Sequence, residues 1–141
     1  MNNYTQLLKQ VQRHEGCELK PYEDTEGILT IGYGRNLEHN GISQGEADTM
    51  LLNDISSVIQ EVKQFDWYEG LSEPRKAVIV NMVFNLGMPR FSKFTNTIGF
   101  LEDGMYEEAS EEMLNSRWAH QVKGRAIELS RQMATGEWQE G

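Results

Sequence analysis

The stretch from His14 to Gly34 reads HEGCELKPYEDTEGILTIGYG and carries five carboxylates, among them Glu15 and Asp24, around a short β-prone segment. Glu15 stands directly before Gly16, a residue type that commonly ends helices. The segment Asp24–Gly27 has the composition of a turn, and Thr30 lies in the hydrophobic run that follows it. We therefore predict a helix end, a turn and a strand from Ile28 to Ile31, which together form a small hairpin or sheet.

These three side chains are of the types that cleave a glycosidic bond. Such cleavage needs an acid to protonate the leaving oxygen and a second carboxylate to activate water or stabilise positive charge. Glu15 and Asp24 can supply the two carboxyl groups, and Thr30 can offer a hydroxyl that holds a water molecule. With 22 acidic residues in the chain, however, the spacing alone permits this chemistry without requiring it.

The remainder of the chain has the periodicity of α-helices. An amphipathic helix is expected over residues 3–14. Ser43 and Glu46 form a capping-box pattern before a helix of about 20 residues, which we place at residues 44–63. Its apolar positions recur as a single stripe: Ala47, Met50, Leu51, Ile55, Val58, Ile59 and Val62.

A further helix is expected from Ser72 and Pro74 to Gly87, and it is apolar nearly all round. That pattern predicts the core helix of a C-terminal lobe. Asn81 and Asn85 lie four residues apart, so they form a polar strip on one side of this helix and should face a cleft or a hydrogen-bond network. Shorter helical segments fill the rest of the chain, with Trp118 and Trp138 as large apolar fillers.

Composition limits the classes of protein to which the chain can belong. Its 141 residues suit one domain, and a net charge of −9 argues against a nucleic-acid partner. No apolar run approaches the roughly 18 residues that span a bilayer, so we expect a soluble protein without membrane insertion. The N-terminus is too polar for a cleavable signal peptide, which predicts synthesis in the cytoplasm.

The histidines and the cysteine do not predict a metal site. His14, His39 and His120 are scattered without ligand spacing, and Cys17 is the single cysteine. We expect no metal and no cofactor. Because no paired base is apparent, Cys17 is interpreted as a small buried apolar residue rather than a nucleophile.

The run from His14 to Gly34 resembles the phage-type lysozymes, glycoside hydrolase family 24. The family pattern is Glu, eight residues, Asp or Cys, five residues, Thr, and Glu15, Asp24 and Thr30 fit it position for position. Arg35 departs from the family, in which many members have histidine there. Later blocks that are similar to the family extend to the C-terminus: Asn81–Gly87, Phe94–Asn96, Ser116–Trp118 and Thr135–Trp138.

The resemblance implies an α+β, predominantly helical, lysozyme-like fold in a single domain over residues 1–141. It implies an N-terminal lobe with a β-hairpin or sheet at about 14–43 and a connecting helix at about 44–63. A helical C-terminal lobe is expected at about 64–141, and helix 3–14 is expected to belong to that lobe as well.

The resemblance also implies the role of each site residue. Glu15 would be the general acid, Asp24 would activate or position water, and Thr30 would orient that water, with inversion at the anomeric carbon. Arg125 stands where family members supply an arginine that pairs with the catalytic glutamate. The residues expected to bind substrate are Asn85, Phe94, Asn96 and Arg125.

The implied activity is that of an endo-acting muramidase that cuts peptidoglycan glycan strands between N-acetylmuramic acid and N-acetylglucosamine. We expect a monomeric phage endolysin, made in the host cytoplasm and released to the periplasm and cell wall through holin lesions. Two alternatives stay open. One is a non-catalytic peptidoglycan-binding module or structural phage component with the same fold, because fold alone does not establish activity. The other is the same fold acting on chitosan or another amino sugar.

Overall fold

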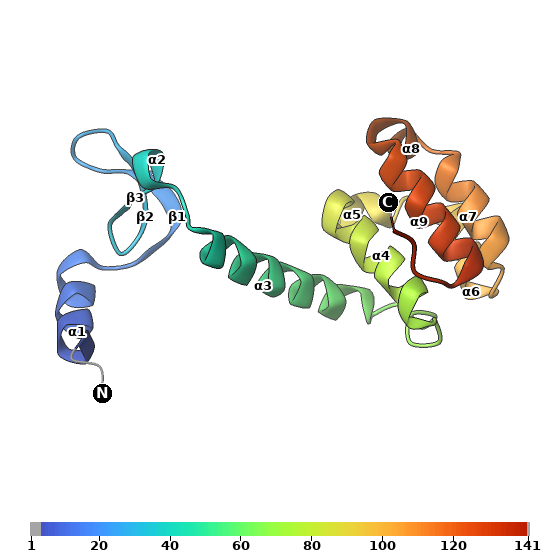
Figure 1. The fold of residues 1–141 in the computed structure, drawn as a ribbon, viewed down its shortest axis with the longest axis horizontal. Helices are drawn as coiled ribbons and strands as arrows, with labels where there is room; N and C mark the ends of the chain where they lie inside the picture. The colour runs from blue at the N-terminus through green and yellow to red at the C-terminus, as the bar shows by residue number, and fades with distance from the viewer. Residues whose placement is uncertain (1–3, 141) are drawn as a thin grey trace. The chain divides into compact units, whose positions relative to one another are not determined.

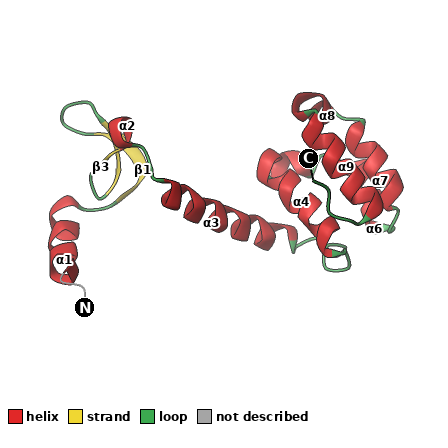
Figure 2. Cartoon of the chain, in the orientation of Figure 1, coloured by secondary structure: helices red, strands yellow, loops and turns green. Residues whose placement is uncertain are grey.

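A computed structural model describes residues 4–140 of the chain and divides it into two compact units, Met1–Met50 and Leu51–Gly141. Each unit is described by itself. Figure 2 shows that strands occur in the first unit, whereas the second unit is built from helices and loops.

The first unit contains a three-stranded antiparallel sheet with strand order β1–β2–β3 (Figure 1). Tyr22 pairs with Thr30 across β1 and β2, and Thr30 pairs with Asn36 across β2 and β3. The predicted strand 28–31 is therefore observed, shifted by one residue. The elements of this unit are α1 (Tyr4–Glu15), β1 (Glu18–Glu23), β2 (Leu29–Gly32), β3 (Arg35–Asn36), α2 (Leu37–Asn40) and the beginning of α3 (Gln44–Val62).

Helix α1 ends at Glu15, as the sequence predicts. Gly16 follows with a φ of +68°, and its N–H donates to the Gln12 carbonyl at 2.9 Å. This left-handed conformation is open to glycine at little cost and closes the helix directly after Glu15. The first residue of the predicted helix, Asn3, lies outside the described residues.

Arg35 joins the sheet to the beginning of α3. Its guanidinium binds both carboxylate oxygens of Glu46, each at 2.5 Å, and donates to the Gly41 carbonyl at 3.3 Å. The Glu46 carboxylate also accepts a hydrogen bond from the backbone N–H of Ser43, and the Ser43 hydroxyl oxygen accepts one from the backbone N–H of Glu46. This reciprocal pair confirms the predicted capping box. The Arg35 hydrogen bonds lower the pKa of Glu46 from 4.5 to about 2.

The second unit is a bundle around α4 and α9, in which α7 lies beside both α6 and α9 (Figure 1). Ser72 caps α4 by accepting from Arg75 N–H, and Gly87 ends it, as predicted. The elements are the remainder of α3, α4 (Glu73–Leu86), α5 (Met88–Phe91), α6 (Thr95–Glu102), α7 (Tyr106–Leu114), α8 (Arg117–Val122) and α9 (Gly124–Thr135).

The prediction that residues 72–87 form a core helix is confirmed. Its buried side chains are Val78, Ile79, Met82, Val83 and Leu86. The prediction for the tryptophans is half right. Trp118 is 3% exposed within α8, whereas Trp138 is 64% exposed and lies beyond the end of the last helix, α9.

The structure confirms an α+β fold that is mostly helical, with its sheet in the N-terminal unit. The helix predicted at 44–63 is observed as α3 at Gln44–Val62, and its role as a connection between two lobes stays a prediction. The grouping of helix 3–14 with a C-terminal lobe, and of the whole chain in one domain, stays a prediction. Among residues 4–140, no helix is long and apolar enough to cross a membrane.

Candidate active site

The carboxylate of Asp24 is held in a fixed orientation by the turn that it begins. Backbone N–H groups of Glu26 and Ile28 donate to Asp24 Oδ1 at 2.8 and 2.9 Å. The backbone closes the same turn, since Gly27 N–H donates to the Asp24 carbonyl at 3.0 Å. Both side-chain bonds go to Oδ1, so Oδ2 remains the oxygen of this carboxylate that can take up a proton from water.

Thr30 is bound to the same turn through one carbonyl group. Its hydroxyl donates to the Ile28 carbonyl at 2.8 Å, and that carbonyl also accepts from Asp24 N–H at 2.9 Å. Thr30 is 4% exposed and lies in the central strand of the sheet. Since its proton is used by Ile28, the lone pairs of the hydroxyl oxygen remain to accept from a water molecule.

Glu15 reaches the other end of the same strand. The sheet turns back after β2 through Gly32, Tyr33 and Gly34, and the Glu15 carboxylate lies against Gly34. A Cβ built on Gly34 would lie 2.8 Å from Glu15 Oε2 and 3.2 Å from its Cδ. Glu15 is exposed to solvent, as a group that meets a substrate must be.

Strand β2 thus connects all three predicted catalytic residues. The Asp24 turn precedes it, Thr30 lies within it, and the turn that touches Glu15 follows it. All three belong to the Met1–Met50 unit. Two carboxylates and a hydroxyl supported by one small sheet are the groups that acid–base hydrolysis of a glycoside requires.

The four residues predicted to bind substrate all belong to the Leu51–Gly141 unit. Phe94 and Asn96 line one hollow of about 220 Å³ at the beginning of α6. Asn85 is exposed, and its Oδ1 accepts from Trp118 Nε1–H at 2.8 Å; its predicted contact with substrate stays a prediction. Trp118 in turn packs edge-on against Phe94, which links Asn85 to the wall of that hollow.

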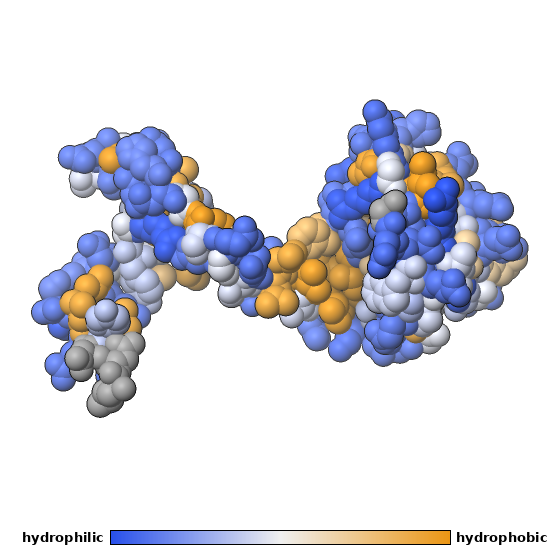
Figure 3. All heavy atoms as spheres, in the orientation of Figure 1, coloured by the Kyte–Doolittle hydropathy of each residue, from blue (hydrophilic) through white to orange (hydrophobic). Residues whose placement is uncertain are grey.

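Arg125 is exposed on α9 and donates to α4. Its Nε and Nη2 lie 3.0 and 2.7 Å from Asn81 Oδ1. Both residues line a groove of about 480 Å³ whose apolar walls include Phe84 and Trp138. Figure 3 shows the hydrophobic surface of α3 and α4 that borders this groove. The predicted pairing of Arg125 with Glu15 joins residues of different units and stays a prediction.

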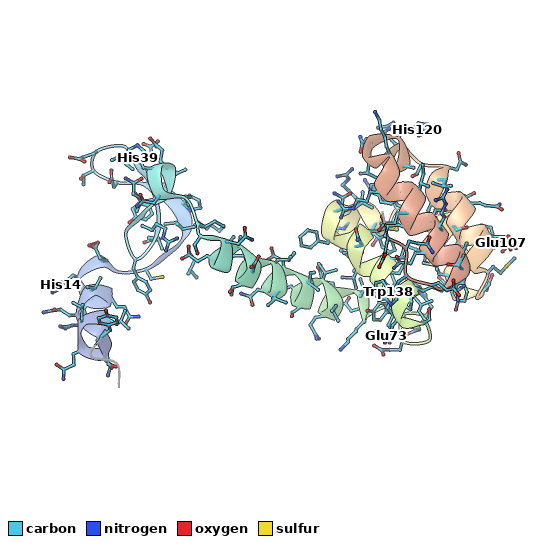
Figure 4. The ribbon with its side chains drawn as sticks, viewed as in Figure 1. His14, His39, Glu73, Glu107, His120 and Trp138 are labelled. Carbon is cyan, nitrogen blue, oxygen red and sulfur yellow. The ribbon has the colours of Figure 1, made fainter. Side chains whose placement is uncertain are left out.

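The histidines lie on separate elements, at the end of α1, in α2 and in α8 (Figure 4). Within residues 4–140, no group of three or more His, Cys, Asp or Glu side chains is placed to hold a metal ion. Cys17 is exposed, so the expectation that it is buried is wrong. It lies between the end of α1 and the beginning of β1.

Comparison with known proteins gives the family. The family model described as phage lysozyme matches residues 12–133, which include the whole segment from Glu15 to Gly34. The chain belongs to the phage lysozyme family.

Three relatives illustrate the range of proteins to which this chain is similar. "Probable T4-type lysozyme 1" of Dictyostelium discoideum is 28% identical, with 86% of this chain and 89% of the relative aligned. An "Endolysin" of Acyrthosiphon pisum secondary endosymbiont phage 1 is 31% identical over 84% of this chain and 82% of the relative. "Pre-baseplate central spike protein Gp5" of Enterobacteria phage T4 is 26% identical over 92% of this chain but only 28% of its own length.

This phage lysozyme is accordingly a glycosidase that hydrolyses peptidoglycan. Sequence reasoning missed three features of its structure: the contact of Gly34 with Glu15, the Arg35–Glu46 pair and the Asn85–Trp118 bond. The glycines around Tyr33 were a signal for the first, because glycine often marks close approach of the backbone to another group.

Proposed function

We propose that this lysozyme is an endo-acting muramidase that cuts the β-1,4 bond between N-acetylmuramic acid and N-acetylglucosamine with inversion. The observation that carries the proposal is the arrangement around β2, in which the Asp24 turn, Thr30 and the Gly34 turn beside Glu15 are consecutive. An inverting reaction needs a rigid base, a water molecule beside it and an acid on the opposite side of the sugar.

In the proposed reaction, Glu15 gives its proton to the glycosidic oxygen as the bond to the anomeric carbon breaks. A water molecule attacks that carbon from the other face and loses a proton to Asp24 Oδ2. The Thr30 oxygen accepts a hydrogen bond from the second O–H of this water, which stays on the water oxygen, and thereby orients the lone pair of that oxygen toward the anomeric carbon. The fixed Asp24 turn supports this role, because general-base catalysis depends on a carboxylate held at hydrogen-bond distance.

The turbidity of permeabilised Gram-negative cells tests the acid. We expect the wild type to clear the suspension and Glu15→Gln to fail, since an amide cannot donate the required proton. Glu18→Gln is the matched control, an exposed glutamate in β1 of the same unit, and should clear at the wild-type rate. Equal clearing by wild type and Glu15→Gln would refute the assignment of the acid.

Two further measurements identify which glycosidic bond is cleaved and whether the configuration at the anomeric carbon is inverted. Borohydride reduction of the released fragments should give muramitol at the new reducing end, whereas glucosaminitol would show cleavage of the other bond. Proton NMR of the first products should show the α-anomer if the reaction inverts. Release of sugar from chitosan instead of peptidoglycan would favour the amino-sugar alternative.

The alternative of a non-catalytic role is disfavoured by the match to the phage lysozyme family. Sedimentation with purified peptidoglycan without any clearing by the wild type would support it. The intact Glu15, Asp24 and Thr30 favour the enzyme, because a binding module has no need of all three.

We further propose that the enzyme acts as a monomeric endolysin, made in the host cytoplasm and admitted to the wall by a holin. The endolysin relatives support this route. Expression in a bacterial host should leave cells intact until a holin is co-expressed. Lysis without the holin would contradict this route, and a dimer in sedimentation equilibrium would contradict the monomer.

A further inference from the structure

Two glycines flank Tyr33 in the turn between β2 and β3, and both have left-handed backbones. The φ angle of Gly32 is +69° and that of Gly34 is +74°. In this conformation, any residue with a side chain is strained to a similar degree at either position. Backbone conformation therefore explains why glycine is suited to both positions.

Gly32 and Gly34 differ in the space that is available for a Cβ atom. A Cβ at Gly32 would meet nothing within 4 Å, whereas a Cβ at Gly34 would meet Glu15 Oε2 at 2.8 Å, Cδ at 3.2 Å and Cγ at 3.7 Å. All three nearest atoms belong to one side chain. The position of Gly34 thus has a second requirement that Gly32 lacks, because the room for a Cβ is already taken by the Glu15 carboxyl group.

We propose that Gly34 is a positioning residue for Glu15, whose carboxyl group occupies the space that a side chain at position 34 would fill. This inference rests on the proposed role of Glu15 as the acid. The turn holding Gly34 is continuous with β2, so contact at Gly34 fixes the acid relative to the strand that carries Thr30.

A methyl group at position 34 would displace the carboxyl group rather than the backbone. The clashing atoms are the far end of a flexible side chain, which can rotate away at little cost in folding. The acid would then leave its place beside the strand. A displacement of about 1 Å at a reacting group can reduce the rate about 100-fold.

The experiment compares Gly34→Ala with Gly32→Ala on soluble peptidoglycan glycan fragments. Both variants should lower Tm by a similar amount, because both place alanine at a positive φ. Only Gly34→Ala should lower kcat, by about 100-fold, with KM unchanged. Equal kcat values in the two variants would overturn the proposal, since strain in the turn would then explain both.

A second pair of variants, Gly34→Asn and Gly32→Asn, tests the proposal if the alanine variants do not fold. Asparagine tolerates the left-handed region better than alanine but carries the same Cβ. Gly34→Asn should therefore fold and still lose kcat relative to Gly32→Asn. Wild-type kcat in folded Gly34→Asn would overturn the proposal.

Carbon-13 NMR of the glutamate carboxyl groups reads the position of Glu15 without reference to activity. The Glu15 signal, assigned by its loss in Glu15→Gln, should move in Gly34→Ala and stay in place in Gly32→Ala. An unmoved signal in Gly34→Ala would overturn the proposal. If Glu15→Gln kept full activity, the proposed acid would be wrong, while the NMR comparison would still decide whether Gly34 positions its carboxyl group.

Discussion

Replacing Asn85 with alanine should destabilise the protein by leaving a buried donor without its acceptor. Trp118 is 3% exposed, and its Nε1–H donates to Asn85 Oδ1 at 2.8 Å. An unsatisfied buried donor costs about 1–3 kcal/mol. Alanine recovers about 0.5 kcal/mol through its higher helix propensity. The net loss should be about 0.5–2.5 kcal/mol in the free energy of unfolding.

Asn81→Ala is the matched control, one turn earlier on the same helix. Asn81 accepts from Arg125, but that arginine is exposed, so its guanidinium can bind water once the amide is gone. The gain in helix propensity is the same. We therefore expect a change within about 0.5 kcal/mol for Asn81→Ala.

Urea unfolding followed by tryptophan fluorescence measures both variants, with the m-value as a check on two-state behaviour. A double-mutant cycle with Trp118→Phe isolates the bond, since Asn85→Ala should cost little once the indole donor is absent. Equal stability of the Asn81 and Asn85 variants would refute the reasoning. Unchanged stability with lost activity in Asn85→Ala would show that Asn85 contacts substrate instead.

Two further predictions concern other arginine contacts. Arg75 donates to the Met133 and Ala134 carbonyls at the end of α9, at 2.7 and 3.0 Å. Arg75→Met should cost about 2 kcal/mol in urea unfolding, because these charge-assisted bonds are partly buried. Lys76→Met is the control, because the half-buried ammonium of Lys76 pairs with the exposed carboxylates of Glu69 and Glu73; it should cost less, and a larger loss there would contradict the argument. Glu46→Gln should lower Tm at neutral pH. The folded pKa of Glu46 is lowered to about 2, so the stability that its charge contributes is present above 4.5 and is lost as pH falls toward 2. The Tm difference between wild type and Glu46→Gln should therefore shrink over that range, and a difference that grows on acidification would contradict it.

Local sequence signals predicted the helices and their ends well. Ser43 with Glu46, Ser72 with Pro74, and Gly16 each act within a few residues of the helix end that they form. The periodicity of α4 likewise predicted its burial. Such features depend on residues that are close together in the sequence, so both partners of each interaction can be recognised in one short segment.

Long-range partners were not predictable in this way. Asn85 could have faced substrate or another side chain, and its partner Trp118 lies 33 residues away on α8. The exposure of Cys17 and Trp138 was also missed. Burial depends on which elements pack over a residue, and hydrophobic character alone does not say whether any element does.

For the site, the sequence by itself determined which groups are present: the order of Glu15, Asp24 and Thr30, the family pattern they fit, and the glycine-rich turn after them. Only the tertiary structure decided what each group touches. Folding β2 between two turns gives Asp24 and Thr30 a common carbonyl and brings Glu15 against Gly34. The physical reason is that hydrogen bonds and steric contacts act over a few ångströms, and chain spacing alone does not fix distances on that scale.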